Sequence, residues 1–260
     1  MTRDTPTDNV VSDSTDGTAT VDPGDAGRRR AKSVKLFLRD ILIIFVAALV
    51  ISFLIKTLLI RSFYIPSASM MDTLLKDDRI IVSLLTPRVV PIDHGDVIVF
   101  QDPGGWLDPA PEIAKNPIAE AIDNALGFVG LSAADSEDHL IKRVIGLPGD
   151  VVVCCDDFGQ ITVNGVPIEE SYIKLPDGVS KATEHDFTVT VPAGSYWVMG
   201  DNRYNSSDSS YHHFEAPGHE YVPVDKVVGR AILITWPANR WTWLDNYPIV
   251  FRGVDSAGDK

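Results

Sequence analysis

A long apolar stretch near the N-terminus constrains what this chain can fold into. From Ile41 to Ile60, all twenty residues are apolar except Ser52, Lys56 and Thr57. At about 1.5 Å per residue, a helix of this length covers the roughly 30 Å hydrocarbon core of a bilayer. Lys56 is close enough to the end for its ammonium to reach the interface. We therefore predict a transmembrane helix over residues 41–60.

Basic residues lie on the N-terminal side of this stretch. Six lysines and arginines occur between Arg28 and Arg39. By the positive-inside rule, we expect residues 1–40 in the cytoplasm and residues 61–260 outside it. A cleavable signal peptide is the alternative, because residues 67–69 offer a small-x-small pattern. The apolar stretch is longer than the usual run of about 7–15 residues in such a signal, so we expect an uncleaved anchor.

The remaining composition indicates one folded domain with a tail. The chain has 260 residues and a net charge of -13, and residues 1–27 are rich in Thr, Asp, Ser and Gly. Such a segment cannot offset the entropy of ordering, so we predict that residues 1–40 form a disordered tail ending in the basic run. Beyond residue 40, twenty-nine Asp and Glu outnumber sixteen Lys and Arg. An acidic domain repels polyanions, and we expect no nucleic-acid binding.

Residues 61–260 have the pattern of a mainly β domain. Short β-branched or alternating runs are separated by turn signals such as Asn164-Gly165. The predicted strands cover residues 79–84, 96–101, 140–144, 150–154, 160–163, 188–191, 195–199 and 227–235. Residues 102–137 interrupt the pattern as an insertion, and residues from about 150 to 195 form a cap-like β region. The aromatic-rich run 236–251 suits either a bilayer interface or a core.

The cysteines and histidines do not form a metal-binding pattern. Cys154 and Cys155 are adjacent, which matches neither a zinc site nor an ordinary framework of disulfide loops. They are either strand residues without a redox role or a disulfide between neighbours, which an oxidising compartment permits. His212, His213 and His219 have no second ligand cluster at a suitable spacing. We expect no metal and assign these histidines to a solvated loop.

A serine hydroxyl needs a base to become a nucleophile, and here the sequence offers a lysine. We find no Gly-x-Ser-x-Gly motif and no Ser/His/Asp pattern. Lys142 stands in an apolar run, with Leu140 and Val144 on its own face of the predicted strand. Burial would lower its pKa from the usual value near 10.4, and a base working at neutral pH needs a fall of about two to three units.

Four segments together resemble the bacterial type I signal (leader) peptidases. They are residues 65–71 (IPSASMM), 94–100 (HGDVIVF), 141–143 (IKR) and 200–209 (GDNRYNSSDS). The resemblance covers residues 61–101 and 140–235. It implies a signal-peptidase-like β fold of small antiparallel sheets on one N-terminal anchor in the bacterial plasma membrane. The implied activity is a serine endopeptidase that removes signal peptides from exported preproteins after a small-x-small site, through an acyl-enzyme and without a cofactor.

The resemblance also implies roles for individual residues. Ser69 is the nucleophile, Lys142 the general base, and Ser206 the hydroxyl that orients the lysine amine. The oxyanion hole combines the backbone N–H of Ser69 with the Ser67 hydroxyl. His139 lies three residues from Lys142, and we assign it to surface or structure.

Acidic family positions that support the site match Asp201 and Asp208. The arginine that usually follows the second acid by two residues is Ser210 here. Arg143 or Arg203 is therefore left to pair with Asp208.

The implied substrate pockets are shallow and apolar. The family positions that line them match Phe63, Ile65, Met70, Leu74 and Ile141. Alternation places Ile141 and Lys142 on opposite faces of their strand. An extended substrate would add as a strand beside residues 63–65 and 138–142.

Two other functions remain open. One is an enzyme of the same fold with a narrower task, such as processing a pilin or a plasmid-transfer component. The other is a catalytically silent single-pass protein that binds exported chains through the same β groove.

Overall fold

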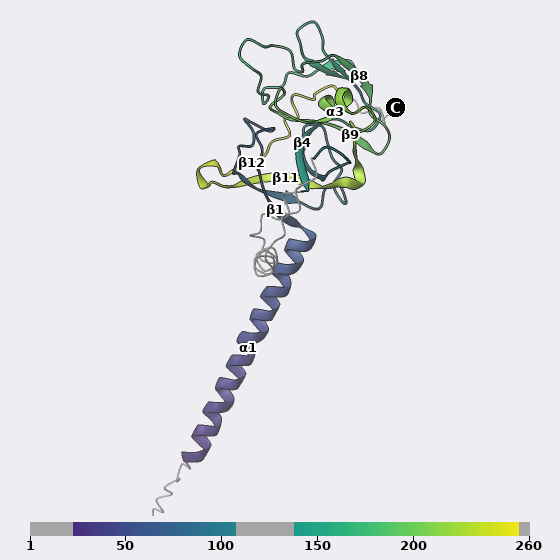
Figure 1. Ribbon diagram of the computed structural model, residues 1–260. Helices are drawn as coiled ribbons and strands as arrows, with labels where there is room; N and C mark the ends of the chain where they lie inside the picture. Colours follow the sequence, from purple (N-terminus) through teal and green to yellow (C-terminus); the bar gives the residue numbers. More distant parts are fainter. Residues whose placement is uncertain (1–22, 108–137, 255–260) are drawn as a thin grey trace, which may run out of the picture. The chain divides into compact units, whose positions relative to one another are not determined.

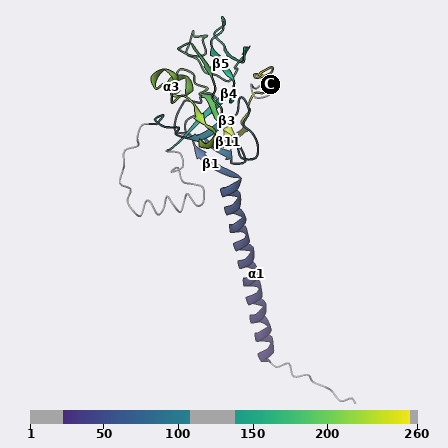
Figure 2. The same cartoon turned by 90° about the vertical axis from the view of Figure 1, so that its right-hand side faces the viewer.

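The N-terminal part of the chain is one long helix. The computed structural model describes residues 23–107 and 138–254, with side chains from residue 36 onward. The helix α1 extends from Pro23 to Leu58, and its segment Leu36–Leu58 is long and apolar enough to cross a membrane. Figures 1 and 2 show α1 as a single uninterrupted element. Its large apolar side chains are exposed, as contact with lipid requires.

The observed helix corrects the predicted boundaries at both ends. Residues 23–40 were expected in a disordered tail, yet they are helical. Arginine, lysine, alanine and leucine are frequent there and all favour helix. At the other end, α1 stops at Leu58 and Ile60 already begins a strand. Residues 1–22 lie outside the described part of the chain.

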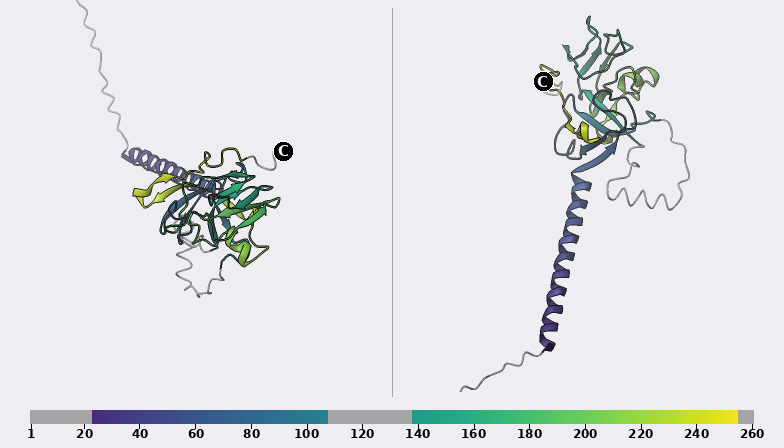
Figure 3. Two further views of the ribbon diagram at one scale, coloured as in Figure 1. Left: turned by 90° about the horizontal axis from the view of Figure 1, so that it is seen from above. Right: turned by 90° about the vertical axis from the view of Figure 1, so that its left-hand side faces the viewer.

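Two antiparallel sheets form the larger unit, Phe53–Lys260 (Figures 1 and 3). The first has the order β1-β2-β11-β3-β4-β9-β10, with β12 paired to β11. Its strands are β1 Ile60–Tyr64, β2 Arg79–Ser83, β3 Val97–Gln101, β4 His139–Gly146, β9 Ser195–Met199, β10 Val222–Pro223, β11 Val227–Trp236 and β12 Thr242–Trp243. The second has the order β7-β6-β5-β8, from β5 Val151–Cys154, β6 Ile161–Val163, β7 Val166–Pro167 and β8 Phe187–Thr190.

The mainly β prediction is confirmed, and each predicted strand is present within a few residues of its expected ends. The second sheet occupies the region predicted as cap-like. β1 was missed because its first residue belongs to the apolar stretch, while β7, β10 and β12 have only two residues each. Among the described residues, three short helices were also missed, namely α3 Ser209–Glu215, η2 Val224–Lys226 and η3 Ala238–Arg240. Most of the predicted insertion, residues 108–137, lies outside the described residues.

The two sheets share one hydrophobic cluster. Ile145, Trp197 and Met199 come from the first sheet and pack with apolar residues of the second. Trp197 is completely buried and its ring lies 4.9 Å from that of Phe187 on β8. This packing joins the strand that carries Lys142 to the smaller sheet.

The sequence left open whether the two adjacent cysteines form a disulfide, and the structure decides between the alternatives. Cys154 and Cys155 form a disulfide between neighbouring residues. Cys154 ends β5 and is buried, and the Thr183 hydroxyl donates a hydrogen bond to its Sγ at 2.9 Å. The disulfide is therefore the alternative that the structure contains.

The aromatic run after β11 is largely exposed. Trp236, Trp241 and Trp243 are each more than half exposed, whereas Phe251 is buried. The sequence left open whether this run lies at a bilayer interface or in the core. Phe251 lies in the core, and these three tryptophans do not.

Replacement of Trp197 tests the shared cluster. Trp197→Ala should lower the free energy of unfolding by about 3–5 kcal/mol, because it leaves a cavity between the sheets. Thermal unfolding of the detergent-solubilised chain measures this. Trp243→Ala, at a side chain 70% exposed, is the matched control and should change stability by less than about 0.5 kcal/mol. Equal effects from the two replacements would contradict the packing described here.

Candidate active site

Ser69 and Lys142 lie in direct contact although 73 residues separate them. Lys142 Nζ donates a hydrogen bond to Ser69 Oγ at 2.8 Å. Both side chains are buried, with Ser69 8% and Lys142 3% exposed. Ser69 stands in the loop between β1 and β2, and Lys142 stands in β4 opposite Ile98 of β3. The pairing of β4 between β3 and β9 holds the lysine in place.

Burial sets the proton affinity of Lys142. Desolvation lowers the pKa of its amine from 10.5 to about 8, while the nearby charges of Asp208 and Asp201 act in the opposite direction. A buried ammonium loses its hydration, and the attraction of these two carboxylates compensates for that loss only in part. The predicted desolvation is confirmed, and a neutral amine becomes accessible close to physiological pH.

The segment after β9 holds the Ser69 loop by its backbone. Asn202 N donates to Ser69 O at 3.0 Å, and Asn202 Nδ2 donates to Ala68 O at 3.0 Å. Gly200 lies against the same loop, because a Cβ built there would be 2.5 Å from Ser69 O and 2.2 Å from Ser206 Oγ. A side chain at position 200 has no room. Asn202 was missed as a site residue, since asparagine in a turn-like segment has no distinctive signal in sequence.

Asp201 forms a fully buried ion pair with Arg143. Arg143 Nε and Nη2 donate to its two carboxylate oxygens at 2.8 and 2.7 Å. The Arg143 guanidinium also lies 4.0 Å from the centre of the Tyr172 ring. The hydroxyl of Thr73, four residues after Ser69, also donates a hydrogen bond to the Asp201 carboxylate. Asp201 therefore ties the nucleophile loop to β4 and β9.

Arg203 does not pair with Asp208 and neither does Arg143. Arg203 forms a buried two-point ion pair with Glu170, with Nη1 2.7 Å from Oε2 and Nη2 2.5 Å from Oε1. Its Nε donates to Gly200 O at 3.1 Å. The expectation that one of the two arginines would pair with Asp208 is wrong, because each has a closer carboxylate. Glu170 was missed, since it lies 33 residues from Arg203 and outside every motif.

Asp208 instead caps a helix. Its Oδ1 accepts hydrogen bonds from Ser210 N at 3.0 Å and Ser210 Oγ at 2.7 Å, at the start of α3. Its Oδ2 accepts from Gly200 N at 2.8 Å. The carboxylate is completely buried and, among described residues, receives only neutral donors. Its charge therefore acts on Lys142 without being cancelled by an adjacent cation.

The two accessory serines differ in position. Ser67 is exposed and its Oγ lies 3.3 Å from Ser69 Oγ. Ser206 lies beside Gly200, but its buried Oγ has no hydrogen-bond partner within the described residues. The structure thus brings Ser206 close to the site without the expected bond to the lysine amine.

The five residues predicted to line substrate pockets belong to one hydrophobic cluster. All five are buried, and they are Phe63, Ile65, Met70, Leu74 and Ile141. Ile141 faces this cluster while Lys142 faces Ser69, as the alternation of β4 requires. The structure brings the predicted set together, and its contact with substrate stays a prediction. His139 lies against Phe63 with ring centres 5.3 Å apart, in a structural contact.

His219 is exposed in a loop as expected, but the other two histidines assigned to that loop are not. His212 and His213 belong to α3, and His212 is buried with its ring stacked 4.5 Å from that of Trp106. Within the described residues, three potential metal ligands do lie together, namely Cys154, Cys155 and Asp186. Both sulfurs of that group are joined in the disulfide.

The family-model match and the curated relatives point to one family. A family model described as signal peptidase, peptidase S26, matches residues 38–236. A probable signal peptidase I of Mycobacterium leprae (strain TN) is 37% identical over 225 residues, covering 76% of this chain and 76% of that protein. A signal peptidase I of Mycobacterium tuberculosis (strain ATCC 25618 / H37Rv) is 38% identical over 220 residues, covering 78% and 74%. A solved signal peptidase I from Enterococcus faecalis V583 is 25% identical, with a TM-score of 0.34 over 54% of this chain and 95% of that chain.

Replacement of Lys142 by methionine tests the burial of the amine. The pKa of Lys142 in the fold lies below its ordinary value, so the folded state is penalised fully below about pH 8 and the penalty disappears above about pH 10.5. Lys142→Met should therefore raise the free energy of unfolding at neutral pH by up to about 3 kcal/mol. The gain over wild type should shrink as pH rises from 8 to 10.5. A variant less stable than wild type at neutral pH would contradict this account.

Replacement of Gly200 tests the contact behind the nucleophile loop. The methyl group of Gly200→Ala would overlap Ser69 O and Ser206 Oγ, so the loop must shift. A displacement of about 1 Å at reacting groups lowers activity by about a hundredfold, which is the expected fall in kcat/KM. Ser207→Ala, at an exposed neighbour of Ser206, is the control and should keep wild-type activity. Wild-type turnover in Gly200→Ala would show that the loop tolerates movement.

Proposed function

The chain belongs to the signal peptidase I family, and on this premise we propose that it cleaves exported preproteins after a small-x-small site, through Ser69 and Lys142. Family membership supports the removal of signal peptides by a serine peptidase. The observation that carries the residue assignment is the 2.8 Å contact between a buried lysine amine and the Ser69 hydroxyl.

The first half of the proposed reaction forms an acyl-enzyme. The neutral Lys142 amine takes the proton of Ser69 as Oγ attacks the carbonyl carbon of the scissile peptide bond. The carbonyl π bond opens and leaves a negative charge on its oxygen. When the tetrahedral intermediate collapses, the C–N bond breaks and the Lys142 ammonium gives its proton to the departing amine. The mature protein leaves, and the signal peptide stays esterified to Ser69.

The second half uses water in place of the serine. Lys142, again neutral, takes a proton from a water molecule whose oxygen attacks the ester carbonyl. Collapse expels Ser69 Oγ, which recovers its proton from the lysine. The signal peptide leaves as a carboxylic acid, and both side chains return to their starting states.

The oxyanion needs donors, and two are proposed. One is the backbone N–H of Ser69 and the other is the Ser67 hydroxyl. Ser67 is exposed and lies next to Ser69 Oγ, which is compatible with a hydroxyl that turns toward a bound substrate. A donor of this kind contributes about 3–4 kcal/mol to the transition state. Ser206 is proposed to orient the lysine amine, because its buried hydroxyl has no hydrogen-bond partner among the described residues.

The substrate is proposed to bind as an extra strand. β9 pairs with β4 only from Arg143 onward, and β1 is the last strand of its sheet. The contact between Phe63 of β1 and His139 of β4 shows that these two edges approach each other. An extended peptide between them would place alternate side chains toward the apolar cluster of Phe63, Ile65 and Ile141.

The membrane arrangement follows from α1. Its segment Leu36–Leu58 is the candidate span, and Ser69 follows eleven residues after its end. Five basic residues precede this segment and Arg39 lies near its start, which favours a cytoplasmic N-terminus, with the catalytic residues on the opposite side of the plasma membrane. Exported preproteins present their cleavage sites at that surface. A silent binder is not favoured, because the chain belongs to a peptidase family and joins Ser69 to a buried lysine.

Cleavage of a preprotein tests the nucleophile. Detergent-solubilised wild type should cut an Ala-x-Ala site after the second alanine, as read by mass spectrometry. Ser69→Ala should lower kcat/KM by about four orders of magnitude or more while leaving thermal stability near wild type. Ser171→Ala, an exposed serine elsewhere, is the matched control and should cut normally. Substantial cleavage by Ser69→Ala would remove this residue from the mechanism.

The pH dependence tests the base. Because only the neutral amine accepts a proton, kcat/KM should rise about tenfold per pH unit below about 8 and level off above it. Lys142→Arg should be inactive at every pH, since guanidinium keeps its charge. A flat profile between about pH 5 and pH 9 or an active arginine variant would exclude Lys142 as the base.

A further inference from the structure

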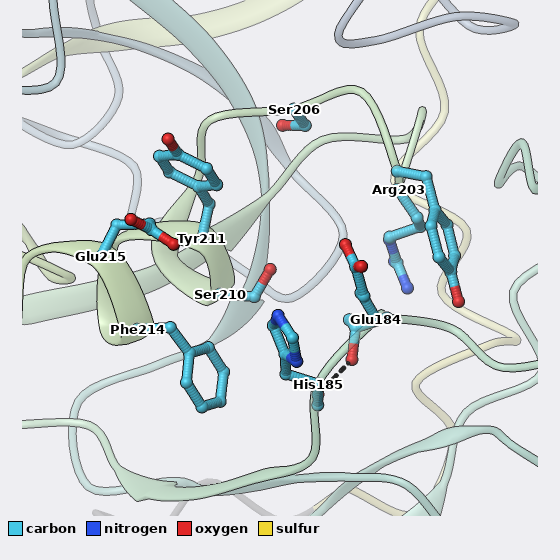
Figure 4. A pocket seen from close by; sticks show the side chains of 10 residues that line it. Glu184, His185, Arg203, Ser206, Ser210, Tyr211, Phe214 and Glu215 are labelled. Atoms are coloured by element: carbon cyan, nitrogen blue, oxygen red, sulfur yellow. Dashed lines mark hydrogen bonds between the residues drawn. The ribbon is translucent and has the colours of Figure 1, made fainter.

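A pocket with an unpaired acidic wall opens next to the proposed catalytic centre (Figure 4). Three segments form it, namely the loop before β8, the turn after Gly200, and α3. The lining residues that determine its chemistry are Glu184, His185, Tyr204, Tyr211, Phe214 and Glu215. None of the roles described above assigns a ligand to this pocket.

Ser206 connects the pocket to the Ser69 loop. Ser206 lines the pocket, and a Cβ built on Gly200 would touch both Ser206 Oγ and Ser69 O. Gly200 therefore separates Ser206 Oγ, on the pocket side, from the backbone oxygen of Ser69. A side chain of a substrate held at Ser69 could reach this pocket within a few residues of the scissile bond.

The charge around the pocket is negative. Glu184 and Glu215 are exposed at its wall, and neither forms an ion pair within the described residues. The positive charge of Arg203 is taken up by Glu170. Lys181, just before the pocket loop, pairs with Asp186 at 2.9 Å.

Two further groups bear on this charge balance. Asp208 lies beneath Ser210 with a buried carboxylate that only neutral groups contact in the described structure. His185 lines the pocket with its ring 4.8 Å from that of Phe214. The fixed charges facing the pocket therefore leave an excess of carboxylate.

Aromatic rings supply the remaining wall. Tyr204, Tyr211 and Phe214 line the pocket and are each more than a third exposed. Figure 4 shows Phe214 and Tyr211 on the α3 side and Glu184 on the opposite side. The faces of aromatic rings attract cations, and the rings also pack against the aliphatic stems of long basic side chains. Carboxylates together with such rings favour an ammonium or guanidinium over a neutral or acidic group.

We propose that this pocket is a subsite for a lysine or arginine side chain of the substrate, close to the scissile bond. The proposal rests on the proposed function, because it requires that Ser69 cleaves a peptide chain. It adds a charge preference to a specificity otherwise limited to small residues at the cleavage site.

The test is a charge scan of one preprotein. Lysine, methionine and glutamate are placed in turn at each of several positions on both sides of a single Ala-x-Ala site, and kcat/KM is measured for each. At one position wild type should prefer lysine to methionine by about twofold to fivefold, as expected for an exposed ion pair, and should disfavour glutamate. Added salt should reduce this ratio.

Variants assign the preference to the pocket. In Glu184→Gln/Glu215→Gln the ratio of lysine to methionine substrate should fall to about one. The matched control is Asp177→Asn/Asp225→Asn, which removes two exposed carboxylates outside the pocket and should keep the wild-type ratio. In Glu184→Lys/Glu215→Lys the preference should reverse toward glutamate.

The outcomes separate the two levels of the proposal. Cleavage of all substrates without a lysine preference, or a preference that persists in Glu184→Gln/Glu215→Gln, would overturn the subsite while leaving the peptidase intact. An absence of cleavage for every substrate would overturn the proposed function and the subsite with it.

Discussion

The site depends on keeping one amine out of water. Lys142 is almost completely buried, and this burial outweighs the attraction of two carboxylates in setting its pKa. Either carboxylate, if it contacted the amine directly, would hold it protonated. Asp201 is instead engaged by Arg143, and Asp208 by the backbone and hydroxyl at the start of α3. The arrangement of these two acids leaves the amine with Ser69 as its described hydrogen-bond partner.

The same groups also fix the position of the nucleophile. Asn202 holds the backbone of the Ser69 loop, and Asp201 reaches the loop through Thr73 and reaches β4 through Arg143. Gly200 packs against the backbone oxygen of Ser69 and leaves no room for a side chain. A strand paired on both sides, an ion pair and a glycine therefore position the dyad.

Sequence reasoning predicted most of the fold because the strands of the larger unit alternate or are rich in β-branched residues. It also brought together Ser69 and Lys142, since the motif order identified the family and the apolar run around Lys142 indicated burial. It did not identify the true partners of Arg143 and Arg203, because ion pairs between distant segments depend on which carboxylate the folded chain brings nearer. Glu170 and Asn202 lie in segments with no chemical signal of their own. The start of α1 lies in the segment predicted as a disordered tail, because the polar composition of residues 1–27 outweighed the high helix propensity of the basic residues that follow.

The central claim is that burial makes Lys142 a base near neutral pH, and direct titration of its side chain tests it. Lysine labelled with ¹⁵N in the detergent-solubilised chain would be followed by NMR as pH is raised, with Lys142→Met identifying the resonance. The account predicts a midpoint of about 8, well below the ordinary lysine value of 10.5. A Lys142 midpoint near 10.5 would contradict it.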